Sequence, residues 1–393
     1  MIRPYRRPVG SLALLLLLPV FFLVSGCEEA AERVEAPSDE APRERSWTGP
    51  TPDGEWTGAV DFPDSPDESR LTSLRQLTHG GTNAEAYFSY EGDRLVFQAT
   101  WPEISECDQI YVMDLDGSNL ERVSTGEGRT TCGYFYPGQS TVLFSSTHHV
   151  DPACPTPPDR SEGYLWGLFP YDVFLRDMNT GELIQLTDTP GYDAEATLSP
   201  DGETIVFTSD RSGDLNLWAM DADGSNPRQL TFSEGYQGGA FFSPDGERIV
   251  YRAFHPRTEE ETQEYRDLLE RNLVAGGRLN VFVMDADGSN KVQVTDNEAS
   301  DFAPFFHPDG ERIVFSSNLH DPGGRSFNLY LIHRDGTGLE RVTQNPEGFD
   351  GFPQFSPDGR HLAFASTRGA SAPGEINVFL AEWLDEESSG NAP

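Results

Sequence analysis

Basic residues are scarce in this sequence, and lysine is almost absent. The 393 residues include 28 Lys and Arg against 65 Asp and Glu, the formal charge is −37, and Lys291 is the only lysine. A surface of this sign repels phosphate groups, so the composition argues against nucleic acid as a partner. It would attract cations or a basic partner, although a GC-rich genome or a saline habitat would produce the same balance.

Recognisable catalytic motifs are also lacking. The sequence has no Gly-x-Ser-x-Gly nucleophile elbow and no glycine-rich phosphate loop. The repeats described below extend to Trp383, so we expect no hydrolase domain after that residue. The sequence therefore favours a protein without enzymatic activity, but it does not decide the question.

Long hydrophobic runs are confined to the N-terminus, where residues 12–24 are apolar. This run is shorter than a typical membrane-spanning helix. It lies between three arginines and the segment Ser25-Gly26-Cys27. Residues 1–27 resemble a bacterial lipoprotein signal peptide, which implies cleavage before Cys27 and lipidation of that cysteine. Ordinary secretion with cleavage nearby is the alternative. Glu28 does not settle whether the inner or the outer membrane keeps the anchor.

Glycine and proline are abundant, with 38 and 29 residues, and many of them belong to one repeated unit. A Ser-Pro-Asp-Gly turn, or a variant of it, recurs at intervals of 44–64 residues. Each turn is followed by a run of β-branched and aromatic residues that favours a strand. A period in the forties with strand content predicts propeller blades. The six turns begin at Ser89, Tyr136, Ser199, Ser243, His307 and Ser356.

The predicted strands also indicate how the ring closes. A fourth strand at Arg75–Thr78 precedes the first unit, whereas the last unit lacks one. We therefore expect Arg75–Thr78 to pair with Asn377–Leu380 and to close an all-β, six-bladed propeller of four-stranded antiparallel blades. The expected domains are the signal peptide at 1–27, a disordered acidic Pro-rich linker at 28–70, the propeller at 71–385 and a disordered tail at 386–393.

The repeated motifs resemble the WD-repeat-like β-propeller repeats of the TolB family. The resemblance lies in Phe-Ser-Pro-Asp-Gly with Ile-Val-Phe, in Met-Asp-Ala-Asp-Gly-Ser-Asn and in Gln-Leu-Thr, and it covers roughly residues 71–384. It implies the propeller fold and a place in the cell envelope. TolB proteins carry an α/β domain before the propeller, and residues 28–70 are too short and too polar to form one.

Two units are longer than the others because each carries an insertion between its second and third strands. The insertions span residues 148–170 and 255–278. The second is predicted to contain a helix, because Thr258 and Glu261 fit a capping box. The residues expected on its apolar face are Tyr265, Leu268, Leu269 and Leu273, and those expected to end it are Gly276 and Gly277.

Cysteine is rare, and three of the four cysteines fall within the predicted propeller. Cys107, Cys132 and Cys154 all map to the end that carries the links between blades and both insertions, which we call the top. Because exported proteins meet an oxidising environment, we expect a disulfide. The favoured pair is Cys132–Cys154, which would pin the first insertion, but which of the three stays unpaired is left open.

The first strand of each unit is expected to line a central channel with a polar top end. Counting back from the turns gives two rings of equivalent positions that are rich in carboxylates. They could bind a positively charged partner or a divalent cation, or they could simply solvate a wet channel. The predicted site comprises Glu85, Asp193, Glu195, Asp301 and Asp350, with Tyr164 and Trp166 as apolar contacts.

Evidence for a metal site is weak. The histidines near the top ends of second strands are His148, His149, His255 and His320. His148 and His255 are possible metal ligands, but they belong to different blades, and ordinary loop histidines are the favoured interpretation. The segments that begin at Asp221 and Asp285 resemble the opening of a calcium loop but lack its later ligands, so we expect hairpin turns there. No other cofactor is expected.

These observations support two hypotheses about function. The first is a monomeric lipoprotein in the periplasm or on the outer surface, whose propeller binds an envelope protein or peptide at its top. The second is a metal-dependent polysaccharide lyase or hydrolase that uses the same face, as some similar propellers do. The sequence does not identify the partner.

Overall fold

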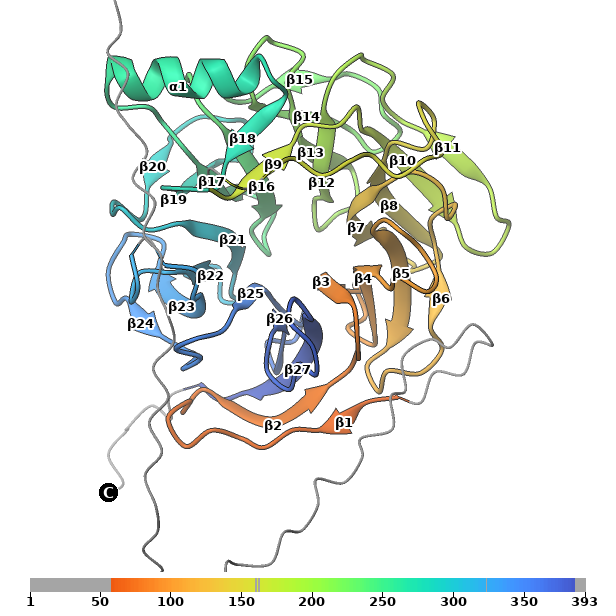
Figure 1. The fold of residues 1–393 in the computed structure, drawn as a ribbon, viewed down its shortest axis with the longest axis vertical. Helices are drawn as coiled ribbons and strands as arrows, with labels where there is room; N and C mark the ends of the chain where they lie inside the picture. The colour runs from red at the N-terminus through yellow and green to blue at the C-terminus, as the bar shows by residue number, and fades with distance from the viewer. Residues whose placement is uncertain (1–57, 160, 162, 323, 386–393) are drawn as a thin grey trace, which may run out of the picture. The chain divides into compact units, whose positions relative to one another are not determined.

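Six sheets surround a central axis in the computed structural model of this chain (Figure 1). The structure describes residues 58–385 except 160, 162 and 323. Each sheet is an antiparallel blade whose strands follow one another outwards from the axis. The expected all-β, six-bladed propeller is therefore confirmed.

The strands of the first three blades follow the predicted units closely. Blade 1 contains β3 (Thr82–Phe88), β4 (Arg94–Thr100), β5 (Gln109–Asp114) and β6 (Glu121–Arg122). Blade 2 contains β7 (Thr130–Phe135), β8 (Thr141–Ser146), β10 (Asp172–Asp177) and β11 (Leu183–Gln185). Blade 3 contains β12 (Asp193–Leu198), β13 (Thr204–Ser209), β14 (Asn216–Asp221) and β15 (Arg228–Gln229).

The remaining blades complete the ring. Blade 4 contains β16 (Gln237–Phe242), β17 (Arg248–Ala253), β19 (Asn280–Asp285) and β20 (Val292–Gln293). Blade 5 contains β21 (Asp301–Phe306), β22 (Arg312–Ser317), β23 (Asn328–His333) and β24 (Glu340–Arg341). Blade 6 contains β25 (Asp350–Phe355), β26 (His361–Ser366), β27 (Asn377–Trp383), β2 (Leu71–Gln76) and β1 (Val60–Asp61).

The N-terminal strand closes the ring as predicted, because β2 pairs with β27 in the register Arg75↔Leu380. The boundary of the expected linker needs correction. Residues 58–70 do not form part of a disordered tether: β1 pairs with β2, and Glu68 is 2% exposed and bonded to Arg368. The short β1 adds a fifth strand to blade 6.

The Gln-Leu-Thr motif has a structural role that repeats around the ring. In blade 3 the Thr231 hydroxyl accepts a hydrogen bond from the Leu217 N–H (2.8 Å) and donates one to the Asn216 side chain (3.0 Å). The hydroxyl therefore satisfies a buried amide where the short fourth strand ends. The equivalent hydroxyls in the other blades belong to Thr78, Ser124, Thr187, Thr295 and Thr343.

The Pro-Asp-Gly turns close the hairpins between first and second strands. In blade 3 the Ser199 hydroxyl accepts a hydrogen bond from the Thr204 N–H at 2.9 Å, and Asp201 accepts one from the Glu203 N–H at 3.0 Å. Gly202 has a φ of 76°, which favours glycine at this position. Local sequence therefore determines these turns.

The two insertions meet beside blades 3 and 4, where Leu168 and Val274 pack in one hydrophobic cluster with Leu215 and Tyr236. The first contains β9 (Leu165–Gly167), and the second contains α1 (Glu259–Leu269) and β18 (Leu273–Ala275). β9 and β18 pair in the register Val274↔Trp166, and α1, β9 and β18 are drawn together over the same part of the ring (Figure 1). We call residues 164–168 and 272–276 the strap. Among the residues that the structure describes, no helix is long and apolar enough to cross a membrane.

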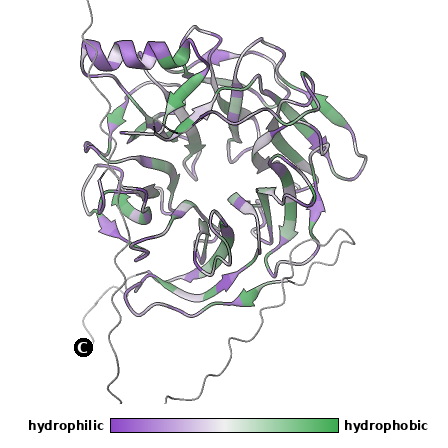
Figure 2. Cartoon of the chain, viewed as in Figure 1, coloured by the Kyte–Doolittle hydropathy of each residue, from purple (hydrophilic) through white to green (hydrophobic). Residues whose placement is uncertain are grey.

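The predicted helix is present but shorter than expected. Thr258 caps it by accepting from the Glu261 N–H at 3.1 Å, and most of α1 is hydrophilic in Figure 2. Tyr265 is its buried contact. Leu273 belongs to β18 and not to the helix, so Gly276 and Gly277 do not end α1. Pairing with β9 explains this difference, because it gives the residues after the helix an extended partner.

Candidate functional site

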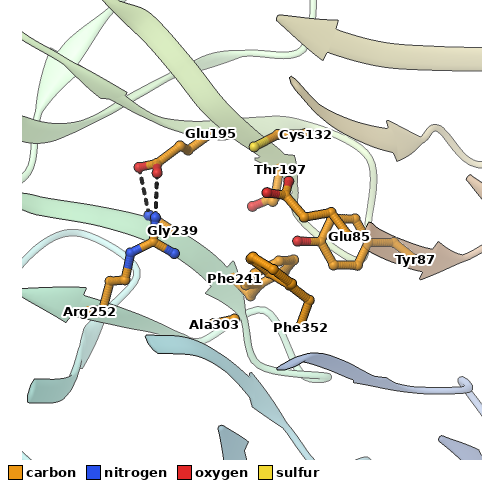
Figure 3. A pocket seen from close by; sticks show the side chains of 10 residues that line it. All are labelled: Glu85, Tyr87, Cys132, Glu195, Thr197, Gly239, Phe241, Arg252, Ala303 and Phe352. Atoms are coloured by element: carbon orange, nitrogen blue, oxygen red, sulfur yellow. Dashed lines mark hydrogen bonds and ion pairs between the residues drawn. The ribbon is translucent and has the colours of Figure 1, made fainter. Parts of the chain in front are cut away.

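One residue in the first strand of every blade adopts a left-handed backbone conformation and faces a cavity on the axis. A break in strand register accompanies each of these residues, as between Ala194 and Thr197 in blade 3. Such β-bulges redirect side chains. The six residues have φ values of 48–57°, and they are Glu85, Cys132, Glu195, Gly239, Ala303 and Phe352. All six line a cavity of about 20 Å³ (Figure 3), so one of the two predicted rings of equivalent positions surrounds this cavity.

Aromatic side chains fill the axis next to this cavity. Tyr87 of blade 1 contacts Phe241 of blade 4 across the ring, with their centroids 5.3 Å apart. Phe241 also contacts Phe305 at 5.2 Å, and Tyr134 lies 6.0 Å from Tyr87. These four residues, which we call the aromatic floor, occupy the space that a wet channel would need. The cavity is therefore a pit and not a segment of an open channel.

Arg252, which no sequence motif indicated, forms the most extensively bonded contact in the pit. Its guanidinium pairs with Glu195, and its Nε donates to the Tyr236 hydroxyl at 3.0 Å. Glu195 also accepts from the Thr208 hydroxyl at 2.7 Å and from the Gly239 N–H at 3.0 Å. The Glu195 carboxylate thus has charged and neutral donors on several sides, as a buried carboxylate requires.

Two consecutive glycines make room for this ion pair. A Cβ on Gly239 would lie 2.4 Å from the Arg252 guanidinium, and one on Gly238 would lie 2.1 Å from Glu195 Oε2. The other blades carry side chains at one or both equivalent positions. The Gly-Gly pair in a predicted inner strand, with an arginine on the neighbouring second strand, was the sequence signal for this cluster.

Glu85 has a different environment from Glu195. Its Oε2 is buried and has no hydrogen-bond partner in the described structure. Burial raises the pKa of Glu85 to about 7, against the opposing effects of the Cys132 thiol and Arg252. Burial also raises the pKa of the Cys132 thiol well above its usual value. Glu85 is therefore the carboxylate in the pit that has the Cys132 thiol as a neighbour but no directly bonded cation among the described residues.

Asp193, Asp301 and Asp350 do not line the pit. They are at most 1% exposed, and each bonds to groups near the end of the adjacent second strand. Asp193 pairs with Arg211 at 2.6 Å, and Asp301 accepts from the Ser317 hydroxyl at 2.6 Å. Asp350 accepts from Arg368 and from the Ser366 hydroxyl, both at 2.7 Å. Burial raises the pKa of Asp193 and Asp301. These three carboxylates have structural partners within their own blades.

The strap brings the two predicted aromatic contacts close to the ion pair. The Trp166 ring lies 5.6 Å from Tyr236, and the Arg252 guanidinium lies 6.0 Å from Trp166. Tyr164 contacts Trp166 at 5.9 Å and remains 55% exposed. The prediction that the insertions border the site is consistent with this geometry, although Trp166 packs inwards and Tyr164 presents its surface to solvent.

The disulfide joins Cys107 to Cys154, with their Cα atoms 5.6 Å apart, so the expected Cys132–Cys154 pairing is wrong. Cys132 occupies a bulge in β7 and faces the axial pit, whereas Cys107 lies at the start of β5, beside the path of the first insertion. Among the described residues Cys132 is the free cysteine. The bond still pins the first insertion, but it does so to blade 1.

The candidate histidines have separate local partners. His148 Nδ1 lies 2.7 Å from the Ser146 hydroxyl, and His255 Nδ1 lies 3.3 Å from the Glu234 carbonyl. His149 pairs with Asp172 at 2.8 Å, and His320 lies 3.0 Å from the Ser326 hydroxyl. Within the described ranges, no group of three or more His, Cys, Asp or Glu side chains is arranged to hold a metal ion.

The fold and the pit define the class of this protein: a closed six-bladed β-propeller with an acidic axial pit beside a strap. Residues 170–264 match the family model described as PD40, TolB beta propeller domain. The Tol-Pal system protein TolB of Wolinella succinogenes is 29% identical over 210 residues, which cover 53% of this chain and 34% of that protein. TolB of Francisella tularensis subsp. mediasiatica is 33% identical over 108 residues, which cover 26% of this chain and 23% of that protein.

Solved structures agree on the fold. TolB from Acinetobacter baumannii has a TM-score of 0.52 at 17% identity, covering 76% of this chain and 65% of that one. The putative TolB from Agrobacterium tumefaciens also has a TM-score of 0.52, at 20% identity, covering 78% and 91%. The chain is therefore a β-propeller, and its residues 170–264 are similar to the TolB propeller domain. The chain spans about a third of the length of the Wolinella relative and about a quarter of the length of the Francisella relative.

Proposed function

We propose that this chain is a cell-envelope lipoprotein whose propeller binds a protein or peptide at its top, over the strap and the axial pit. The observation that carries the proposal is the exposed Tyr164 ring on the strap. Both insertions contribute a strand to the strap, and its Trp166 packs against Arg252. Tyrosine side chains are common anchors in protein interfaces, and the pairing of β9 with β18 holds this one in place. The excess of acidic residues supports a partner with positive charge.

The envelope location is supported by two independent features. The Cys107–Cys154 disulfide is typical of oxidising compartments, and similarity to Tol-Pal system proteins is consistent with that location. The proposed anchor, Cys27, lies outside the described residues, and it rests on the resemblance of residues 1–27 to a lipoprotein signal. Attachment is proposed to be through lipid only, with the propeller acting as a monomer.

Replacing the proposed lipidation site should change where the protein is found. Cys27→Ser should move the protein from the detergent-extractable membrane fraction to the soluble fraction, or leave a larger uncleaved precursor, because the lipid acceptor is gone. Fractionation and metabolic labelling with a fatty acid would measure this, with Cys132→Ser as the control that keeps the label. A fatty-acid-labelled band of unchanged intensity in Cys27→Ser would contradict the proposed anchor.

Binding at the top can be tested with a random peptide library presented to the full-length protein in detergent. We expect enriched peptides to carry Lys or Arg next to an apolar residue and to bind more weakly as salt is raised. Tyr164→Ser should weaken binding of these peptides by about tenfold or more, because an interface anchor is lost. The control is Leu339→Ser, which removes a 48% exposed apolar side chain from the β23–β24 hairpin at the opposite end. Equal losses in both variants, or no enrichment, would contradict the proposal.

A further inference from the structure

The charges in the pit do not balance. Glu195 and Arg252 form one neutral pair, with Tyr236, Thr208 and the Gly239 N–H completing the bonds to the carboxylate. Glu85 lies on the opposite side of the pit (Figure 3), and its buried Oε2 has no hydrogen-bond partner in the described structure. When Glu85 is ionised, these groups leave one uncompensated negative charge, which is costly in a buried site unless a donor reaches it.

The shape of the pit limits what that donor can be. Its volume of about 20 Å³ accommodates a group about the size of one water molecule. A calcium ion would need six to eight oxygen ligands, and the described residues offer no such cluster. A planar guanidinium is larger and would require several acceptors to satisfy its donors. The head group of a primary ammonium has the required size, with three donors and a single charge.

The walls of the pit also suit an ammonium on an alkyl chain. Rings from Tyr87, Phe241 and Phe352 line it on several sides, and aromatic faces attract cations. The aromatic floor blocks passage further along the axis, so a group that enters must stop beside Glu85. Glu85, Cys132, Arg252 and Phe352 each keep partial exposure, so the pit is not sealed by its own lining.

From these contacts we propose that the axial pit is a subsite for a primary ammonium group, a lysine side chain or an N-terminal amine of the partner, with the Glu85 carboxylate as its counter-ion. This inference rests on the proposed function, because it identifies the part of the partner that enters the propeller. The uncompensated Glu85 oxygen would accept from the ammonium, and the alkyl chain would contact the aromatic walls.

The groups around Glu85 give the subsite a pH dependence. Cys132 on β7 and Arg252 on β17 favour its ionised form, whereas Glu195 on β12 and Asp108 before β5 disfavour it. Tyr87, on the same strand, is neutral because burial raises its pKa. Because the pKa of Glu85 is raised to about 7, the ionised fraction is about tenfold smaller at pH 6 than at pH 8. A lysine ammonium stays protonated over this range, so binding should strengthen as pH rises.

The test uses a defined probe and the full-length protein. Nα-acetyl-lysine methylamide is titrated by ligand-observed NMR, with the norleucine analogue as its neutral counterpart and calcium chloride as a competitor. We expect the lysine probe to bind about tenfold more weakly at pH 6 than at pH 8, the norleucine probe not to bind, and calcium to compete no better than sodium at equal ionic strength. Equal binding of both probes, a flat pH profile, or displacement by calcium alone would overturn the proposal.

Two variants test whether the lysine probe binds at Glu85. Glu85→Gln keeps the shape of the side chain and should reduce binding of the lysine probe by tenfold or more at pH 8, whereas Glu103→Gln removes an exposed charge at the same end and should change it less than twofold. Similar effects of both variants would overturn the assignment to Glu85. If Glu85→Gln is poorly folded, the pH profile and the probe comparison in the unmodified protein still decide the question.

The outcomes also separate this inference from the proposed function. Library peptides that depend on Tyr164 but not on Glu85, together with no binding of the lysine probe, would remove the ammonium subsite and leave the docking function standing. Binding of the lysine probe through Glu85, with no peptide enriched on the strap, would support the subsite and remove the docking function.

Discussion

Arg368→Met should destabilise the propeller by about 3–5 kcal/mol, because it leaves two buried carboxylates without their shared partner. Arg368 Nη1 donates to Glu68 at 2.7 Å, and its Nη2 pairs with Asp350 at 2.7 Å. Glu68 precedes the closing strand and Asp350 begins blade 6, so this one guanidinium joins the two ends of the ring. The measurement is the free energy of unfolding from urea titrations followed by tryptophan fluorescence.

Arg360→Met is the matched control for this prediction. Arg360 lies in the same blade, and its side chain is 81% exposed beside Asp358, so its loss should change stability by less than about 0.5 kcal/mol. If the free energies of unfolding of the two variants differ by less than about 1 kcal/mol, the buried network contributes little to closing the ring. Earlier proteolysis within residues 58–78 of Arg368→Met would show that the closing segment detaches first.

Arg252→Met should have an effect of similar size, about 3–5 kcal/mol, because it leaves Glu195 buried without a counter-ion. The variant also removes the contact between Arg252 and Trp166, so the strap should loosen. Hydrogen exchange at residues 164–168 should become faster, in parallel with the fall in unfolding free energy.

Adding Glu195→Gln to Arg252→Met should recover part of the lost stability, because the double variant has no isolated charge. Arg257→Met is the control, since that arginine is 42% exposed and pairs with Asp296 and Glu298 on the surface. A double variant less stable than Arg252→Met would show that Glu195 is stabilised by its neutral donors. Unchanged exchange in the strap would show that Arg252 does not hold Trp166.

The fold could be predicted from sequence because its determinants are local and repeated. The Ser199 turn and the Thr231 hydroxyl act within a few residues or within one blade, and the same chemistry recurs around the ring. The closing strand followed from counting those repeats. By contrast, β1 has two residues, and nothing in its own sequence indicates that it pairs with β2.

The candidate site was predicted only in part, because bulges break the period-two rule of strands. Asp193 and Glu195 are two residues apart and would share a face in a regular strand. The left-handed conformation of Glu195 and the register break after Ala194 separate them. Asp193 therefore bonds to Arg211, whereas Glu195 faces the axis. Symmetry predicted which positions are equivalent, but it did not predict their side-chain directions.

Contacts between residues that are far apart in the chain could not be predicted from the sequence. Three cysteines at one end allow several pairings, and the path of an inserted loop decides among them. Arg252 enters the pit only because Gly238 and Gly239 leave space in another strand. Leu273 continues the apolar spacing of the helix, yet pairing with the other insertion draws it into β18.

Ring closure by an N-terminal strand has a consequence for the order of events during synthesis. The Thr78 hydroxyl accepts from the Val378 N–H, a contact between residues 300 positions apart. β2, which is synthesised early, must therefore wait for β27, the last strand to be synthesised, and the edge of β2 that pairs with β27 stays open until then. Contacts of such sequence separation form slowly. A nascent chain that stops before the last blade would keep two open edges, so it should depend on holding chaperones and aggregate without them.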